Sequence, residues 1–228
     1  MMKKKIIIFL IIVIVFINIL LIISLTPNYK KEKPEEETPI QESQIEEKEE
    51  KKEKRMSLVA VGDALIHNGI YLDASLGNGK YDFMDMFTDI EPLIQNYDLK
   101  YYNQETIIGG KNLGLSNYPR FNSPDEIGLD MLKTGFNMVS LANNHALDKN
   151  EVGVLYSVNF WNNTNAIVSG QNSSFEDRNN KIKVYEQNGI KYAFLAYTNS
   201  TNGLSIPNGK EYLINVYSNE QAQEDIDK

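Results

Sequence analysis

The chain of 228 residues contains no cysteine. This absence excludes a disulfide framework, a thiol nucleophile, a cysteine-based metal site and a lipid anchor on cysteine. Positive charge is also scarce, because 23 Lys and Arg stand against 31 Asp and Glu, for a net charge of −8. The deficit is concentrated in residues 56–228, which carry −9. Such an acidic region repels phosphate backbones, so we expect no nucleic-acid partner, whereas divalent cations would be attracted.

Long apolar runs are confined to one place near the N-terminus. Residues 6–25 are twenty residues in which only Asn18 and Ser24 are polar. A helix of this length covers about 30 Å, the thickness of a membrane core. No small-x-small cleavage motif follows, and three lysines precede the run, which keeps residues 1–5 in the cytoplasm. The sequence therefore predicts an uncleaved signal anchor at 6–25, rather than a cleaved signal or a buried helix. The predicted protein is a single-pass cell-membrane protein with its C-terminal domain outside the cytoplasm.

Residues 26–55 form a charged linker between the anchor and the rest of the chain. From residue 30 to 55 it contains ten Glu and eight Lys or Arg, and no aromatic residue. This composition cannot bury enough apolar surface to offset the entropy of ordering. We expect a disordered tether, in preference to a helix that binds a partner.

Residues 56–228 show alternating strand and helix patterns. Short apolar runs predict strands at 56–61, 99–103, 138–142 and 167–169. Helices are predicted from near Asp89, over 123–134 with Ser123 as its cap and Gly135 as its terminator, and over 151–163. A hairpin follows at 181–197, turning at Asn188-Gly189. This alternation indicates an α/β domain with a largely parallel sheet covered on both faces.

Three of the predicted strands end in polar residues suited to a metal site. The first gives Asp63 and His67, the second Asn103 and Glu105, and the third Asn144, His145 and Asp148. Parallel strands bring their carboxyl ends to one edge of the sheet, and carboxylate, imidazole and amide oxygen are all metal-ligand types. Both histidines of the chain lie in these loops. Each motif alone has a plainer interpretation: Gly-Asp as a turn, a lone His as a satisfied side chain, Asp148 as the cap of the next helix.

These motifs resemble those of the CapA (PgsA) family of capsule and poly-γ-glutamate biosynthesis proteins. The similarity is carried by GD-x3-H at 62–67, N-x-E-T at 103–106 and TGFNMVSLANNHALD at 134–148, and the anchor with its charged tether adds to it. That family belongs to the calcineurin-like metallophosphoesterase superfamily. The resemblance implies a metallophosphoesterase-like α/β sandwich that holds divalent metal ions, a pair by the family's pattern. Its expected ligands here are Asp63, His67, Asn103, Glu105, Asn144 and His145, with His145 and Asp148 as catalytic residues.

The chain departs from the family pattern in its C-terminal half. The family carries further histidines there, in an HWG-type strand end and a GHxH-like loop, whereas this chain has no histidine after His145. We therefore expect a C-terminally truncated product whose sandwich is incomplete, with an open sheet edge and exposed apolar surface.

Three functions are compatible with these observations. The first is a metal-dependent, phosphoesterase-like hydrolase or transferase at the cell surface, acting on an anionic polymer or a small molecule. The second is a non-catalytic accessory subunit that binds other capsule-synthesis membrane proteins. The third is a truncated product without function.

Overall fold

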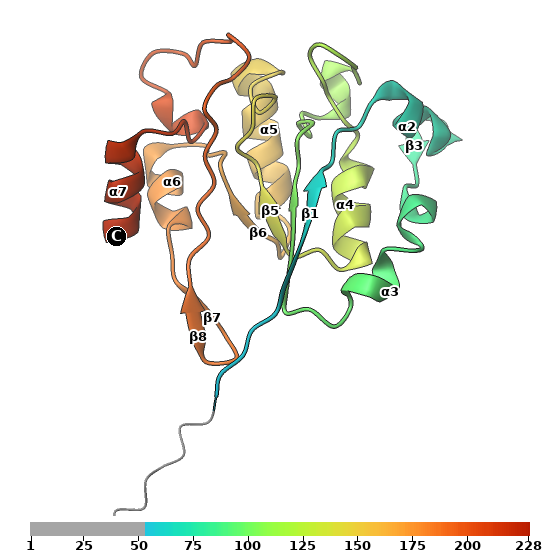
Figure 1. Ribbon diagram of the computed structural model, residues 1–228. Helices are drawn as coiled ribbons and strands as arrows, with labels where there is room; N and C mark the ends of the chain where they lie inside the picture. Colours follow the sequence, from blue (N-terminus) through green and yellow to red (C-terminus); the bar gives the residue numbers. More distant parts are fainter. Residues whose placement is uncertain (1–52) are drawn as a thin grey trace, which may run out of the picture. The chain divides into compact units, whose positions relative to one another are not determined.

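The computed structural model describes residues 53–228 (Figure 1). The predicted anchor at 6–25 and the predicted linker up to residue 52 lie outside the described residues. From residue 53 onward, no helix combines the length and the hydrophobicity that crossing a membrane requires.

A parallel sheet of four strands forms the centre of this region. Its strands are β1 (Leu58–Asp63), β4 (Leu99–Asn103), β5 (Met138–Ser140) and β6 (Ile167–Ser169), in the order β1-β4-β5-β6. All three pairings are parallel, which confirms the predicted α/β class with a parallel sheet. The last residues of the strands stand side by side, so the loops that follow them leave from one edge.

One face of the sheet is covered by helices. The two that connect its later strands are α4 (Asp125–Thr134) and α5 (Asn150–Asn162). Tyr102, Val139 and Val168 are registered neighbours on β4, β5 and β6, and they share one buried cluster with Met131 of α4 and Trp161 of α5. Burial of these side chains is the main stabilising term for the layer.

The opposite face is covered only in part. The ring of Phe194 lies edge-on to Tyr101 of β4, with centroids 5.9 Å apart, and the amide of Ala196 donates to Ser169 Oγ of β6 at 3.0 Å. Beyond them, Leu58 of β1 is 55 % exposed. The predicted covering of both faces is therefore incomplete at β1.

The connection from β1 to β4 is the part that the sequence predicted least well. It contains α2 (Asn68–Asp73), a hairpin of β2 (Ser75–Gly77) and β3 (Lys80–Tyr81), the 3-10 turn η1 (Met84–Phe87) and α3 (Glu91–Ile94). The helix predicted from Asp89 is thus only four residues long. Its apolar residues, which recur at helical spacing, are divided between η1 and α3.

Helix α4 starts without the predicted serine cap. Pro124 occupies the N-cap position and no side chain caps the helix. The hydroxyl of Ser123 instead donates to Thr106 Oγ1 at 2.6 Å, in the loop after β4. The predicted terminator is confirmed, because Gly135 has φ 116° and ends the helix in the left-handed region.

The C-terminal part consists of short elements joined by loops. After η2 (Lys111–Leu113), which lies in the loop before α4, come α6 (Phe175–Lys181), β7 (Tyr185–Gln187), β8 (Ile190–Tyr192), η3 (Glu211–Leu213) and α7 (Asn219–Asp227). Asn188 and Gly189 have φ of 53° and 73°, as the predicted hairpin turn requires. Figure 1 shows this hairpin beside the start of β1, at the end of the sheet away from the loops that carry the predicted site.

Candidate functional site

Asp63 and Asn103 meet at the carboxyl edge of the sheet. They are the last residues of β1 and β4 and are paired in register. The amide of Asn103 donates to Asp63 Oδ1 at 2.8 Å, and Asn103 Oδ1 accepts a longer bond of 3.3 Å from Asn143. Asn103 thus orients the Asp63 carboxylate, and both ends of its amide are already engaged.

Hydrogen bonds hold the three loops together. The amide of Gln104 donates to Ser140 O at 3.0 Å, which joins the loop after β4 to β5. The hydroxyl of Thr106 donates to Ala64 O at 3.1 Å, which joins the same loop to the one after β1. Because each loop is bonded to its neighbour, Glu105 is held between the two other strand ends.

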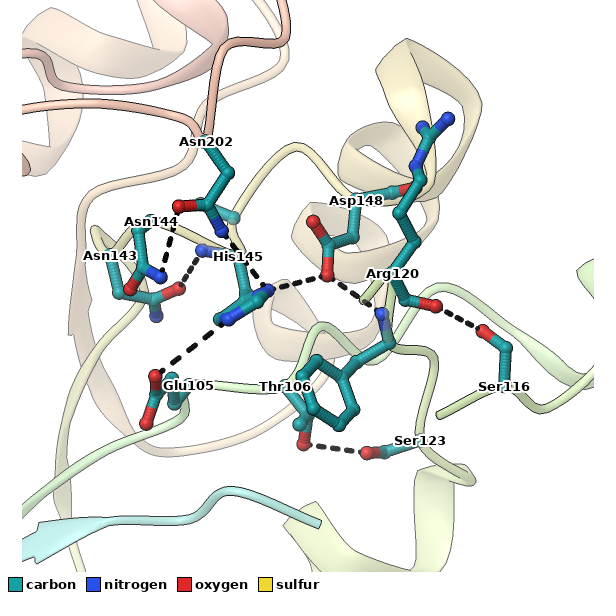
Figure 2. A network of polar contacts seen from close by, with 12 residues as sticks. Glu105, Thr106, Ser116, Arg120, Ser123, Asn143, Asn144, His145, Asp148 and Asn202 are labelled. Carbon is teal, nitrogen blue, oxygen red and sulfur yellow. Dashed lines mark hydrogen bonds and ion pairs between the residues drawn. The ribbon is translucent and has the colours of Figure 1, made fainter. Parts of the chain in front are cut away.

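His145 is the most constrained side chain of the site. Its backbone N–H donates to Asn143 Oδ1 at 2.9 Å, and its ring Nδ1 lies 2.7 Å from Asp148 Oδ2. A carboxylate only accepts, so Nδ1 donates to Asp148 and Nε2 is the nitrogen that faces the rest of the site. Figure 2 shows the ring between Asp148 and Glu105, with Nε2 4.0 Å from Glu105 Oε1. The free nitrogen therefore points toward a carboxylate without touching it.

Asp148 lies behind the histidine and is only 1 % exposed. Besides His145, its Oδ2 accepts from the amide of Phe121 at 2.7 Å, while the guanidinium of Arg120 donates to its backbone oxygen at 3.0 Å. The interpretation of Asp148 as a helix cap is wrong, because the N-cap of α5 is Lys149 and no side chain caps that helix. Its carboxylate orients the imidazole instead.

The pKa of Glu105 depends on its burial and on the charges of its neighbours. Burial raises the pKa of its carboxyl above the ordinary value, and the negative charge of Asp63 raises it further. The two histidines, His145 and His67, act in the opposite direction. Asp63, His145 and His67 are therefore close enough for their charges to affect the pKa of Glu105.

His67 joins the group through an aromatic contact. Its Nδ1 lies 2.9 Å from Asn117 Oδ1. The ring of Phe121 is edge-on to both imidazoles, with centroids 5.1 Å from His67 and 4.8 Å from His145. Phe121 thus spaces the two histidines.

Asn144 lies on the far side of His145. Its amide donates to Asn202 Oδ1 at 3.3 Å, and Asn202 Nδ2 is 3.4 Å from His145 Nδ1. These residues line a cavity of about 490 Å³ that also contacts Tyr118 and Arg120. Three of the predicted residues, Asn144, His145 and Asp148, therefore line this polar pocket.

The sequence did not single out the residues that organise this neighbourhood. Asn143 hydrogen-bonds to two of the loops, and the ring of Phe121 contacts both histidines. Asn117 contacts His67 and Asn202 contacts His145, although both asparagines are distant from these histidines in sequence. Asn143 could have been found from its place in the NNH motif. Nothing local marks the other three.

Across residues 53–228, no three His, Asp or Glu side chains form a ready-made metal cluster. This finding covers four of the six predicted ligands, namely Asp63, His67, Glu105 and His145; the other two are asparagines. The donor chemistry nevertheless suits a divalent cation: two carboxylates and two imidazoles, with amide oxygens beside them. The 4.0 Å from His145 Nε2 to Glu105 Oε1 is too long for a hydrogen bond. It is within the reach of two bonds of about 2.1 Å each to one ion.

A protein-family model matches this chain. The family model described as bacterial capsule synthesis protein PGA_cap matches residues 57–228. This range includes every element of the fold and all of the site residues described above. A search of curated proteins finds no match.

Proposed function

The chain belongs to the PGA_cap family of bacterial capsule synthesis proteins, and we propose that it serves capsule synthesis at the outer surface of the cell membrane. In this proposal residues 6–25 anchor the chain and the charged linker separates the domain from the membrane. The apolar length of that segment and the three lysines before it support this arrangement. The polymer proposed is poly-γ-glutamate or a related surface polymer.

We further propose that the domain is a metallophosphoesterase-like α/β sandwich with a divalent-metal-dependent hydrolase or transferase site. The single observation that supports this proposal is the position of His145, whose Nε2 faces Glu105 Oε1 at 4.0 Å at the carboxyl edge of the sheet. Two carboxylates held beside each other repel, and a cation between them would relieve that repulsion. Asp63, Glu105, His67 and His145 would hold the metal, with the amide oxygens of Asn103 and Asn144 completing its shell.

A bound divalent ion would supply Lewis-acid stabilisation of an oxyanion and a more acidic water. The chain's own residues do the rest. Asp148 fixes the ring of His145 so that Nε2 faces the site, and it stabilises any positive charge on that imidazole. Asn103 orients Asp63 through its amide. His145 and Asp148 are thus the pair that would manage protons if a proton moves at Nε2.

A non-catalytic accessory role is the second candidate function. In the described part of the chain, no three Asp, Glu or His side chains are grouped so that they could bind a metal, which favours this role. Both ends of the Asn103 amide are also already hydrogen-bonded. In that role the domain would bind other capsule-synthesis membrane proteins, and its loops would be structural.

The two functions can be separated in a bacterium that makes the polymer with this protein. The full-length chain carrying His145→Ala or Asp63→Ala is compared with Asp89→Ala, an exposed aspartate outside the site. The enzymatic proposal expects polymer yield to fall by about 100-fold or more for both site variants at equal protein level. Normal yield with the two site variants would reject it and support the accessory role.

A further inference from the structure

A second cavity adjoins the site on the side of Asp63. It has a volume of about 320 Å³ and lies between the end of β1, helix α2, the η1–α3 segment and α4. Its walls are aliphatic and aromatic, and include Ile66, Ile70, Met86, Ile127 and Met131. Among the described residues that line it, Asp63 is the only charged one.

The cavity is large enough and open enough to take a ligand. Its volume is about twice that of a 150 Å³ apolar cavity that accommodates benzene, and it falls at the lower end of the range for ligand pockets. Gly62, Asp63 and Met86 are exposed, so they form its mouth, whereas Ile127 and Met131 are buried at its base. An apolar pocket of this kind favours hydrocarbon over water.

The position of the pocket constrains what it would bind. Asp63 belongs both to the mouth of this pocket and to the group of residues around Glu105. The polar pocket lined by His145, Asn144 and Arg120 is a separate one and shares no lining residue with the apolar pocket. A molecule that fills the apolar pocket and reaches Asp63 at its mouth therefore has an apolar part and a polar part.

We propose that the apolar pocket binds the aliphatic portion of an amphiphilic substrate whose anionic group lies next to Asp63. The placement of the anion rests on the proposed function, because an anion beside a carboxylate needs a cation there. The binding of the aliphatic portion does not rest on it. The substrate class is thus an alkyl-bearing phosphate or carboxylate.

The inference is tested with a series of alkyl phosphates on the full-length chain in lipid nanodiscs. An octyl phosphate with a diazirine at the end of its chain serves as the photolabel, and butyl, hexyl and octyl phosphate compete with it. Each buried methylene raises the affinity by up to about fourfold. The longer alkyl phosphates should therefore compete more strongly with the photolabel, until the pocket is full. Inorganic phosphate and phosphocholine headgroup serve as chain-free competitors.

Two pairs of variants locate the binding site. Met86→Glu places a charge at the mouth, and Leu93→Glu places one on the same segment at a residue that is 68 % exposed and does not line the pocket. Ile70→Asp and Leu72→Asp form the second pair, both on α2, of which only Ile70 lines the pocket. We expect labelled peptides from 61–70 and 86–90, with labelling reduced at least tenfold by Met86→Glu and Ile70→Asp and unchanged by the controls.

Several outcomes would overturn the inference: competition that does not depend on chain length, labelling elsewhere, or equal labelling of Met86→Glu and Leu93→Glu. The same labelling experiment in EDTA separates the inference about the apolar pocket from the metal proposal. Chain-dependent labelling that persists in EDTA supports the apolar pocket, whatever the outcome of metal analysis.

Discussion

At the scale of single residues, the pairing of His145 with Asp148 determines which ring nitrogen faces the site. A buried carboxylate 2.7 Å from Nδ1 accepts a hydrogen bond from that nitrogen and turns Nε2 toward Glu105. Such carboxylate–histidine pairs raise the basicity of a metal-binding imidazole. The function of Asp148 is therefore to position His145.

Replacing Asp148 by asparagine tests this positioning. An asparagine can still accept from the amide of Phe121 but lacks the charge that stabilises the imidazole. We expect Asp148→Asn to lower divalent-metal affinity by about 10- to 100-fold, measured by titration of the full-length chain with Zn²⁺ or Mn²⁺. An unchanged affinity, with the fold intact by circular dichroism, would show that Asp148 does not act through His145.

Glu105 gives a prediction with a definite pH dependence. Burial and the charge of Asp63 raise its pKa above the ordinary 4.5, so the folded protein holds this proton more tightly than the unfolded chain. Ionisation thus has no cost below pH 4.5, and it destabilises the fold progressively as pH rises through the raised pKa. In EDTA, Glu105→Gln should raise the free energy of unfolding at pH 7, by less than about 1 kcal/mol because the group is partly exposed. Urea unfolding should show no such gain at pH 4, and a loss at pH 7 would contradict the account.

At the scale of elements, Asp98 joins the starts of β1 and β4 to the β7–β8 hairpin. Its carboxylate accepts from the amide and hydroxyl of Ser57, at 2.8 and 2.9 Å, and from Gln187 and Asn188. The bonds from Ser57, followed by those from the two amides, lower its pKa from 3.8 to about 2. One side chain therefore connects three elements.

The lowered pKa of Asp98 fixes the sign of its effect on stability. The contribution is present in full above pH 3.8 and is lost as pH falls toward 2. Asp98→Ala should therefore lower the thermal midpoint at pH 7 by about 2–4 °C, whereas Asp89→Ala should not change it. Near pH 2 the wild type and Asp98→Ala should approach each other. Equal midpoints at pH 7 would mean that the hairpin is held by other contacts.

Helices α6 and α7 are joined by the buried ion pair of Arg178 and Asp225, which are 9 % and 3 % exposed. Removing one partner leaves a buried charge without its counterion. We expect Asp225→Ala to destabilise the domain by about 3–5 kcal/mol in urea unfolding, and the double variant Arg178→Met, Asp225→Leu to lose much less. If the single and double variants lose the same amount, the pair makes no special contribution.

Strands and turns with a local signal were predictable from the sequence. The run at 167–169 is apolar and forms β6, and Asn188-Gly189 adopts the positive φ values that its composition favours. The connection at 64–98 was predicted poorly, because its short elements are too brief for periodicity to identify them. Ser123 was assigned to the wrong partner because Thr106, its actual partner, is distant in sequence.

At the scale of the whole molecule, the parallel sheet explains why three separate motifs could be placed at one edge. The rule that parallel strands end together was sufficient to group Asp63, Glu105 and His145. It could not predict Asn117 or Asn202, since these come from long loops whose path depends on tertiary packing. Nor could it predict that β1 leaves one face exposed, which depends on segments far along the chain.

The central claim is that these strand ends form one cation site. Its most direct test is elemental analysis of the full-length chain, purified without chelator and dialysed, for the wild type, Asp63→Ala, His145→Ala and the control Asp89→Ala. The account predicts at least one equivalent of a divalent transition metal in the wild type and the control, and loss of most of it in the two site variants. A wild type that retains no metal when offered Zn²⁺ or Mn²⁺, or equal metal in all four proteins, would contradict it.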